Sequence, residues 1–414
     1  MHSEDKQALN HLTAHLFREN AGKMTAVLVR LYGIDNLDTI TDAIQDTFES
    51  ALLKWRYSGV PENPSAWLIK VARNKTINVL KRNARSVTVL PSDRTNNTEP
   101  EVVFSENEIT DSQLRLLLAC CRLDLTSQKK MMLTLNVLCG FGVREIANAL
   151  LLSDEAVKKA LYRSKSELKN KKQQFENPEK EDIRKYSVML HTFVYLLFNE
   201  GYKTTSDAAG INIDLCYEAI RLAKLIREQD TSNPEINGLL ALLFFTIARF
   251  PARITTTGEW LTLAEQDRSL WNPTFIAEGF YYLDQAKPKQ QLNTYYLEAL
   301  IASLHCTASS FDHTDWSAIV YLYEQLERLQ PESILIRLNR IVAEMHIHIT
   351  SEQFEAIDQI ETAFGKENRF VWLTTKAYAY ERLGDLIVAR YWYNEALPFA
   401  KTTMDRAFIL KKTA

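Results

Sequence analysis

Residues 140–169 read GFGVREIANALLLSDEAVKKALYRSKSELK. Apolar residues recur here at helical spacing in two blocks, which predicts a short helix over 143–150 and a second helix after a turn at 151–154. Ser153 or Asp154 can cap the second helix, because a side-chain oxygen at that position accepts from unpaired backbone N–H groups. Two helices joined by so short a turn are typical of a helix-turn-helix.

The second of these helices carries a basic face. Residues near its start would reach base edges, and the later cations would meet DNA phosphates. The competing interpretation is a solvated basic face on an ordinary helical hairpin. The candidate DNA contacts are Glu155, Lys158, Lys159, Arg163 and Lys165.

Upstream, PSAWLIKVARNKTINVLKRNAR (64–85) predicts a basic helix that no acidic residue interrupts. Pro61 and Pro64 break the preceding pattern, and Ser65 can cap the new helix. Such a helix suits single-stranded or melted DNA, because cations hold the backbone while amides and an aromatic ring address exposed bases. The alternative is that Trp67 belongs to the core and the asparagines are merely exposed. The candidates are Trp67, Lys70, Arg73, Asn74, Asn78, Lys81 and Arg82.

The segment before it, LDTITDAIQDTFESALLKW (37–55), predicts a helix that is acidic on its outer face. Its inner face is predicted to hold Ile40, Ala43, Phe48 and Leu52. An acidic helix beside a basic one is a poor DNA ligand, but it could dock a basic protein surface. A solvated face is the alternative. The outer acids are Asp38, Asp42, Asp46 and Glu49.

Composition supports an all-α protein, because 12 glycines and 11 prolines are few for 414 residues. Residues 1–173 hold 25 Lys and Arg against 20 Asp and Glu, and residues 174–414 hold 24 against 32. A basic front and an acidic back indicate a nucleic-acid-facing half followed by another function. The five cysteines form no C-x-x-C pair, so buried reduced thiols are expected. The N-terminus has no signal-like segment, and a soluble cytoplasmic protein is expected.

Changes in pattern divide the chain into domains. Residues 8–86 are predicted to form a first helical domain, 87–110 a polar linker, and 111–172 a second domain that contains the helix-turn-helix. After a polar break at 173–181, residues 182–414 read as a helical solenoid. Its turn signals recur at Asn233-Pro234, Asn272-Pro273, Pro288, Gln330-Pro331 and Gly384-Asp385. In its last unit, small residues and aromatics alternate as at helix crossings: Ala377, Tyr380, Gly384, Ala389, Tyr393 and Ala396.

Together, TDAIQDTFESALLKW, WLIKVARNKTINVLKR, a linker and a helix-turn-helix resemble an extracytoplasmic-function sigma factor of the sigma-70 family. The resemblance implies that Asp42, Gln45, Asp46 and Phe48 contact core RNA polymerase. It assigns the −10 element to Trp67, Lys70, Arg73, Asn74, Asn78, Lys81 and Arg82, with the loop at 60–65. It assigns the −35 element to Glu155, Lys158, Lys159, Arg163 and Lys165. Ala160 departs from the arginine common in such recognition helices, which leaves the −35 preference open.

The second half resembles the long tetratricopeptide-like extension of one subgroup of these sigma factors. The segments that carry this resemblance are YLLFNEGY (195–202), LCYEAIRLAKLI (215–226), GLLALLFFTIAR (238–249), EQDRSLWN (265–272), TDWSAIVYLYEQL (314–326) and LNRIVA (338–343). The extension is expected to regulate the factor, and a protein or peptide is its expected partner. An aromatic set could line its concave face, although repeat core is the simpler assignment: Tyr378, Tyr380, Tyr391, Trp392 and Tyr393.

The expected partners are core RNA polymerase and promoter DNA, with no membrane. No nucleophile–base pair, metal-ligand spacing or phosphate loop is visible, so we expect no enzyme, no cofactor and no metal. Charges in the second half are expected to be structural: His191, Glu200, Arg249, Arg253, Asp267 and Arg268. The main alternative is a helix-turn-helix regulator whose C-terminal domain binds a ligand or a partner.

Overall fold

A computed structural model describes residues 20–87, 106–150, 152–170, 180–202, 213–255, 260–288, 291–360, 369–400 and 403–413. These residues are almost entirely helical, and their extended pairing is one isolated bridge between Ile254 and Trp260. The all-α prediction is therefore confirmed. The start of the first predicted helix (7–19), residues 88–105 of the linker and most of the break at 173–181 lie outside the described residues.

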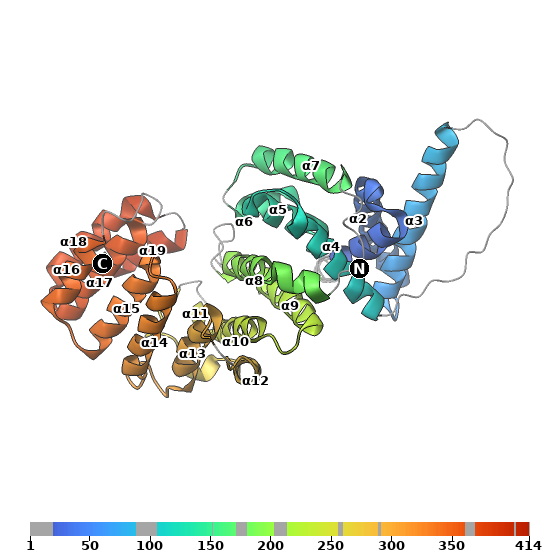
Figure 1. The fold of residues 1–414 in the computed structure, drawn as a ribbon. Helices are drawn as coiled ribbons and strands as arrows, with labels where there is room; N and C mark the ends of the chain where they lie inside the picture. Colours follow the sequence, from blue (N-terminus) through green and yellow to red (C-terminus); the bar gives the residue numbers. More distant parts are fainter. Residues whose placement is uncertain are drawn as a thin grey trace. The chain divides into compact units, whose positions relative to one another are not determined.

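The chain divides into two compact units, Met1–Phe193 and Val194–Ala414. The predicted domains 8–86 and 111–172 thus fall in one unit, and helix α8 (Lys180–Tyr202) begins in the first unit and ends in the second (Figure 1). The first unit also contains a helix over 20–32, η1 (Ile34–Asn36), α2 (Leu37–Ser58), α3 (Pro64–Val87), α4 (Glu106–Arg122), α5 (Ser127–Leu138), α6 (Val143–Ala149) and α7 (Asp154–Asn170).

Helices α2 and α3 form where their apolar periodicity predicts them. The inner face of α2 is buried at helical spacing from Leu37 to Trp55. The helix ends at Gly59, whose φ of 77° is accessible to glycine at little cost. Pro64 then opens α3, and the Asn63 side chain accepts from the backbone N–H of Ala66 at 3.0 Å.

The pair α6 and α7 falls at the predicted positions. The Ser153 hydroxyl accepts from the N–H of Ala156 at 3.2 Å, which makes Ser153 the capping side chain of α7. Val157, Leu161 and Leu168 are buried along the inner face of α7. Ser164 is buried on the same face.

The second unit continues with α9 (Ile213–Gln229), α10 (Pro234–Ala248), α11 (Phe250–Arg253), η3 (Arg268–Leu270), α12 (Pro273–Gln285), α13 (Thr294–Thr307), α14 (Trp316–Leu329), α15 (Ile334–Ile347), α16 (Ser351–Gln359), α17 (Arg369–Leu383), α18 (Leu386–Ala396), η5 (Leu397–Phe399) and α19 (Thr403–Thr413). Two of the predicted turn signals begin helices, because Asn233 caps α10 and Asn272 caps α12 with proline in the next position.

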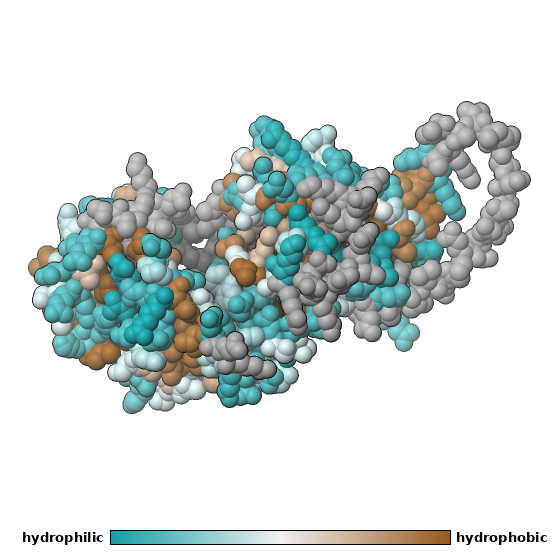
Figure 2. Space-filling view, in the orientation of Figure 1, coloured by the Kyte–Doolittle hydropathy of each residue, from teal (hydrophilic) through white to brown (hydrophobic). Residues whose placement is uncertain are grey.

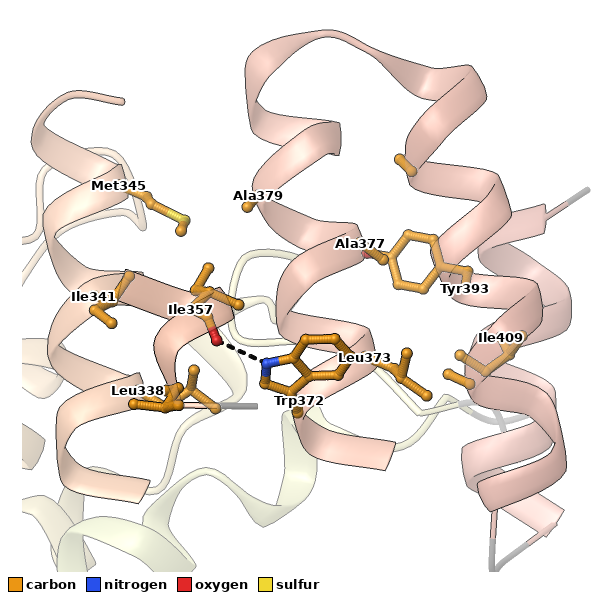
Figure 3. Close-up of a cluster of buried hydrophobic side chains, with 13 residues drawn as sticks. Leu338, Ile341, Met345, Ile357, Trp372, Leu373, Ala377, Ala379, Tyr393 and Ile409 are labelled. Atoms are coloured by element: carbon orange, nitrogen blue, oxygen red, sulfur yellow. Dashed lines mark hydrogen bonds between the residues drawn. The ribbon is translucent and has the colours of Figure 1, made fainter. Parts of the chain in front are cut away.

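The last helices of this unit pack around Trp372 (Figure 3). Its ring is fully buried, and its Nε1 donates to the carbonyl of Ile357 at 2.8 Å. Gly384 makes the turn between α17 and α18 with a φ of 90°. The small and aromatic residues predicted at this crossing lie in or against the same core, namely Ala377, Tyr380, Ala389, Tyr393 and Ala396.

Four cysteines are buried free thiols, as predicted, and Cys306 is half-buried. Figure 2 shows a mainly hydrophilic surface with hydrophobic patches over α3 and over the C-terminal helices. Among the described helices, none combines the length and the apolar character needed to cross a membrane.

Candidate nucleic-acid interface

One face of α3 is polar, basic and exposed. Asn74 and Asn78 are exposed one turn apart, with Lys70, Lys81 and Arg82 on the same helix. Arg73 is half-buried. The predicted residues therefore form a continuous stripe, in which amides lie between cations. Such a stripe can hold a phosphate backbone and still present hydrogen-bonding groups to unpaired bases.

Lys75, by contrast, points back to α2. Its ammonium donates to the carbonyl of Asp46 at 2.6 Å and to the hydroxyl of Ser50 at 2.7 Å. This cation fixes α3 on α2 and is not part of the exposed stripe. Basic residues on one helix thus divide into those that hold the fold and those that face solvent.

Trp67 packs at the start of the stripe. Its ring lies 5.3 Å from the ring of Trp55 and beneath the ammonium of Lys54, 5.9 Å from that nitrogen. Trp67 is half-buried, so it has both a core contact and a partly accessible surface. A core position and a base contact are compatible for Trp67, because an anchored aromatic ring can still stack on a base.

The outer face of α2 is acidic and exposed at Asp42, Gln45 and Asp46. Phe48 does not share this face: its side chain is only 4% exposed and belongs to the core of α2. The assignment of Phe48 to a partner surface is therefore corrected. Periodicity already placed Phe48 inward, and a buried ring cannot meet a rigid partner.

Two exposed apolar side chains on α2 were not predicted from the sequence. Leu53 is 68% exposed and Tyr57 is 85% exposed, and both continue the stripe of Asp42, Asp46 and Glu49 at intervals of three or four residues. Large apolar groups at the end of a charged stripe are typical of protein–protein interfaces. The spacing of Leu53 and Tyr57 from the acidic residues is visible in the sequence. Leu53, however, lies within the apolar run ALLKW (51–55), where burial is the usual expectation.

On α7, Glu155, Lys158, Lys159 and Arg163 are exposed, as a DNA contact requires. Tyr162 lies among them and is 79% exposed, a further surface group that the charge pattern did not reveal. Charged groups around an exposed aromatic ring give this face both phosphate ligands and a surface for base or sugar contact.

The Lys165 side chain contacts α2 in this structure and does not lie on the exposed face of α7. Its ammonium lies 3.9 Å from the Asp38 carboxylate, and Lys169 contacts the same carboxylate at 2.5 Å. Burial lowers the pKa of Lys165, and the carboxylates of Asp38 and Asp42 oppose that shift. Lys165 is thus separated from the exposed basic face to which the sequence assigned it.

The helix over 20–32 also contacts the second half of this unit. Gly22 lies so close to α5 that a Cβ would fall 1.6 Å from the Leu138 carbonyl oxygen. Arg30 approaches the Asp111 carboxylate at 3.6 Å and the Ser112 hydroxyl at 3.4 Å. The residues before and after the linker are therefore held together at several points.

In the second unit, Arg253, Asp267 and Arg268 have structural partners. The Arg253 guanidinium lies 3.6 Å from the Tyr202 ring centroid and 4.1 Å from that of Trp260. Asp267 accepts from the N–H of Ser269 at 2.9 Å, and Arg268 donates to the carbonyl of Ala308 at 2.9 Å. Burial raises the pKa of Glu200 to about 7. Within the described residues, no group of His, Cys, Asp or Glu could hold a metal ion.

This unit also contains a cavity of about 680 Å³. Trp316, His346 and Tyr378 form part of its wall: His346 stacks on Trp316 at 3.9 Å, and its Nε2 pairs with the Tyr378 hydroxyl at 3.1 Å. Burial, with Arg382 nearby, lowers the pKa of His346 to about 4. Of the predicted aromatic set, Tyr378 and Tyr393 line the cavity, whereas Tyr391 is exposed.

Two protein families match parts of the chain. Residues 16–86 match Sigma-70 region 2, and residues 187–287 match a family of unknown function (DUF6596). "Uncharacterized protein R00370" of Rhizobium meliloti (strain 1021) is 31% identical over 383 residues, which cover 90% of this chain and 89% of that protein. No solved structure shows significant similarity.

Proposed function

Since this chain belongs to the family of R00370 from Rhizobium meliloti and, through its region 2, to the sigma-70 family, we propose that it is a sigma factor of the extracytoplasmic-function subfamily. It binds core RNA polymerase, directs it to specific promoters and helps to open the duplex. It is a transcription initiation factor and performs no catalysis of its own.

One observation carries this proposal. Within the residues that match Sigma-70 region 2, α2 presents an acidic face and α3 presents a basic face with two amides. Lys75 and the shared core hold the two helices together. An acidic surface attracts a basic protein, and a basic stripe attracts nucleic acid, so one small domain can link polymerase to DNA.

On α2, the proposed polymerase contacts are Asp42, Gln45 and Asp46, extended by the exposed Leu53 and Tyr57. On α3, Asn74 and Asn78 read the melted −10 element, while Lys70, Arg73, Lys81 and Arg82 hold its backbone. Trp67, anchored on Trp55, offers a stacking surface beside them.

Helices α6 and α7 form the proposed −35-binding helix-turn-helix. Lys158, Lys159 and Arg163 meet phosphates and base edges, with Glu155 at the start of the helix and Tyr162 among them. Lys165 joins this set only when it leaves Asp38. The exposure of this face supports the assignment, because a recognition helix must enter the major groove without rearranging its own core.

The second unit is proposed to be a tetratricopeptide-like regulatory domain. Its cavity has the volume of a typical ligand site and mixed aromatic and polar walls. Thr375 lines the cavity, so Thr375→Trp should fill it and alter promoter output in the cell without changing core binding. Equal output from Thr375→Trp and from the unchanged protein under all conditions would argue against regulation through this cavity.

Transcription in vitro with core RNA polymerase tests the main proposal. A sigma factor confers initiation at specific promoters, whereas a helix-turn-helix regulator binds duplex DNA alone and does not. Asp46→Lys should weaken core binding while leaving the fold intact, because an exposed charge contributes little to stability. Glu332→Lys, the same charge reversal at an exposed turn of the second unit, is the matched control. Equal co-purification of both variants with core polymerase would refute the assignment of α2.

A further inference from the structure

Two helices of the second unit each turn one face toward the cavity of about 680 Å³. The lining residues are three or four positions apart, which places them on the same side of each helix. Both faces carry polar groups along their length, so an elongated ligand with several polar atoms fits them better than a compact apolar one. On α15 the face includes Asn339, Val342 and His346, and on α17 it includes Thr375, Tyr378 and Arg382.

A row of aromatic rings forms part of the cavity wall. Trp316 stacks on His346 at 3.9 Å, and the ring centroids of Phe311 and Tyr378 lie 5.0 and 5.9 Å from that of His346. The row from Phe311 to Tyr378 is therefore up to about 11 Å long, the length of about three extended residues at 3.3–3.6 Å each. Burial lowers the pKa of His346 to about 4 and that of His305 to about 3, so both rings are uncharged at neutral pH.

Two of the carboxylates at the cavity are neutralised within the chain. Glu265 accepts from the ammonium of Lys411 at 2.6 Å, and Glu381 accepts from that of Lys412 at 2.7 Å. Glu381 also accepts from the Tyr393 hydroxyl at 2.6 Å. Neither carboxylate is left with an unopposed charge for a ligand.

Asp312 and Arg382 also line the cavity, and neither forms an ion pair with any residue that the structure describes. Asp312 directly follows Phe311 at one end of the row of rings, and Arg382 lies one turn after Tyr378 at the other. The Arg382 guanidinium donates to a backbone carbonyl of α15 at 3.2 Å, which leaves its charge without a carboxylate. Arg382 lowers the pKa of His346 and Asp312 raises it, so both groups act electrostatically on the same ring of the cavity wall. An unmatched anion and an unmatched cation therefore adjoin the two end rings.

We propose that this cavity binds a short peptide with free termini, whose ammonium meets Asp312 and whose carboxylate meets Arg382. A peptide of about three residues in extended form spans the row of rings. Its side chains pack on those rings, and Asn339 and Thr375 offer hydrogen-bonding groups to its peptide units. The inference rests on the proposed regulatory role of the cavity only for the effect on transcription, because binding itself is measured directly.

Isothermal titration calorimetry on the full-length protein compares the tripeptide Phe-Ala-Phe with its N-acetyl form and its C-terminal amide. The free tripeptide should bind, and blocking either terminus should weaken binding about tenfold, because each block removes one hydrogen-bonded charge. A free tripeptide that does not bind would refute the proposal. Equal affinity of the free and N-acetyl forms would also refute it, because the cavity would then accept the tail of a longer chain.

Two variants assign the termini to their partners. In Asp312→Asn the free and N-acetyl tripeptides should bind alike, and in Arg382→Gln the free tripeptide and its amide should bind alike. Asp284→Asn and Arg328→Gln, at exposed positions of the same unit outside the cavity, are the matched controls and should retain the full discrimination. Circular dichroism establishes that each variant is folded, and the blocked peptides test the unchanged protein without any substitution. Discrimination that persists in both cavity variants would overturn the assignment of the site.

Failure of the proposed function gives a different pattern. The titrations need no polymerase, so a protein that binds the tripeptide but supports no promoter-dependent transcription would refute the sigma function and leave the ligand class standing. Conversely, a protein that binds no tripeptide, but whose promoter output changes in Thr375→Trp, would refute the ligand class alone.

Discussion

Replacing Lys75 by methionine should destabilise the first unit while leaving its affinity for nucleic acid almost unchanged. Lys75 lies in the most basic helix of the chain, yet its ammonium donates to the Asp46 carbonyl and the Ser50 hydroxyl. Methionine keeps most of the apolar stem and removes both hydrogen bonds. Hydrogen bonds to a charged group are individually worth roughly 1.5–3 kcal/mol, and both acceptors here are near solvent, so a total loss of about 1–2 kcal/mol is expected.

For a unit of this size, that loss lowers the melting temperature by roughly 2–8 °C. The matched variant is Lys81→Met, six residues further along the same helix, where the side chain is exposed. It should melt like the unchanged protein, but it should lower the salt dependence of binding to a labelled single-stranded oligonucleotide by about 0.7.

Thermal unfolding followed by circular dichroism, together with anisotropy at several salt concentrations, measures both quantities for both variants. The two variants should each change one quantity. Lys75→Met should lower the melting temperature alone, and Lys81→Met should lower the salt dependence of binding alone. A Lys75→Met protein that melts normally but loses salt dependence would show that Lys75 faces nucleic acid and that its bonds to α2 do not persist in solution.

Three further outcomes follow from the structure. Trp372→Phe leaves the buried Ile357 carbonyl without its donor, so chemical denaturation should show about 2–3 kcal/mol less stability; an unchanged midpoint would contradict the packing in Figure 3. For Glu265, burial opposes ionisation, but hydrogen bonds from Lys411 and Thr262 prevail and lower its pKa to about 2. Because the folded pKa lies below the unfolded value of about 4.3, this stabilisation is present above that pH and is lost toward pH 2. The side chain is partly exposed, so the effect is below about 1 kcal/mol, and the melting gap between the unchanged protein and Glu265→Gln at pH 7 should close at pH 2 rather than persist. Asn78→Ala should change promoter opening and −10 preference in permanganate footprinting; normal opening with the same preference would contradict the role of Asn78.

Local patterns predicted the local structure well. The helix expected over 37–55 spans Leu37–Ser58, and the one expected over 64–85 spans Pro64–Val87. Proline at 61 and 64, with Gly59 at the helix end, determines these boundaries through backbone conformation alone. The turn signals at Asn233 and Asn272 likewise began helices. Such features depend on neighbouring residues, which a single sequence contains.

Contacts between distant segments were not predictable in the same way. Asp38 and Lys169 are separated by 131 residues, and nothing in either local pattern selects one partner over another exposed charge. The same limit applies to Lys75, which periodicity could not distinguish from the solvent-facing lysines of α3. Phe48 shows the reverse error: its spacing indicated burial, the family resemblance suggested a contact, and the spacing was correct.

These distinctions determine how the basic residues of the first unit should be interpreted. Charge alone assigns α3 and α7 the same role, but their cations fall into three groups by contact. Lys75 binds a carbonyl and a hydroxyl on α2, Lys165 and Lys169 meet the Asp38 carboxylate, and Lys81 and Lys158 face solvent. Only the last group is immediately available to DNA. The first two groups must lose contacts within the first unit before they can meet a phosphate, so a count of charges overstates the cationic surface that this unit presents.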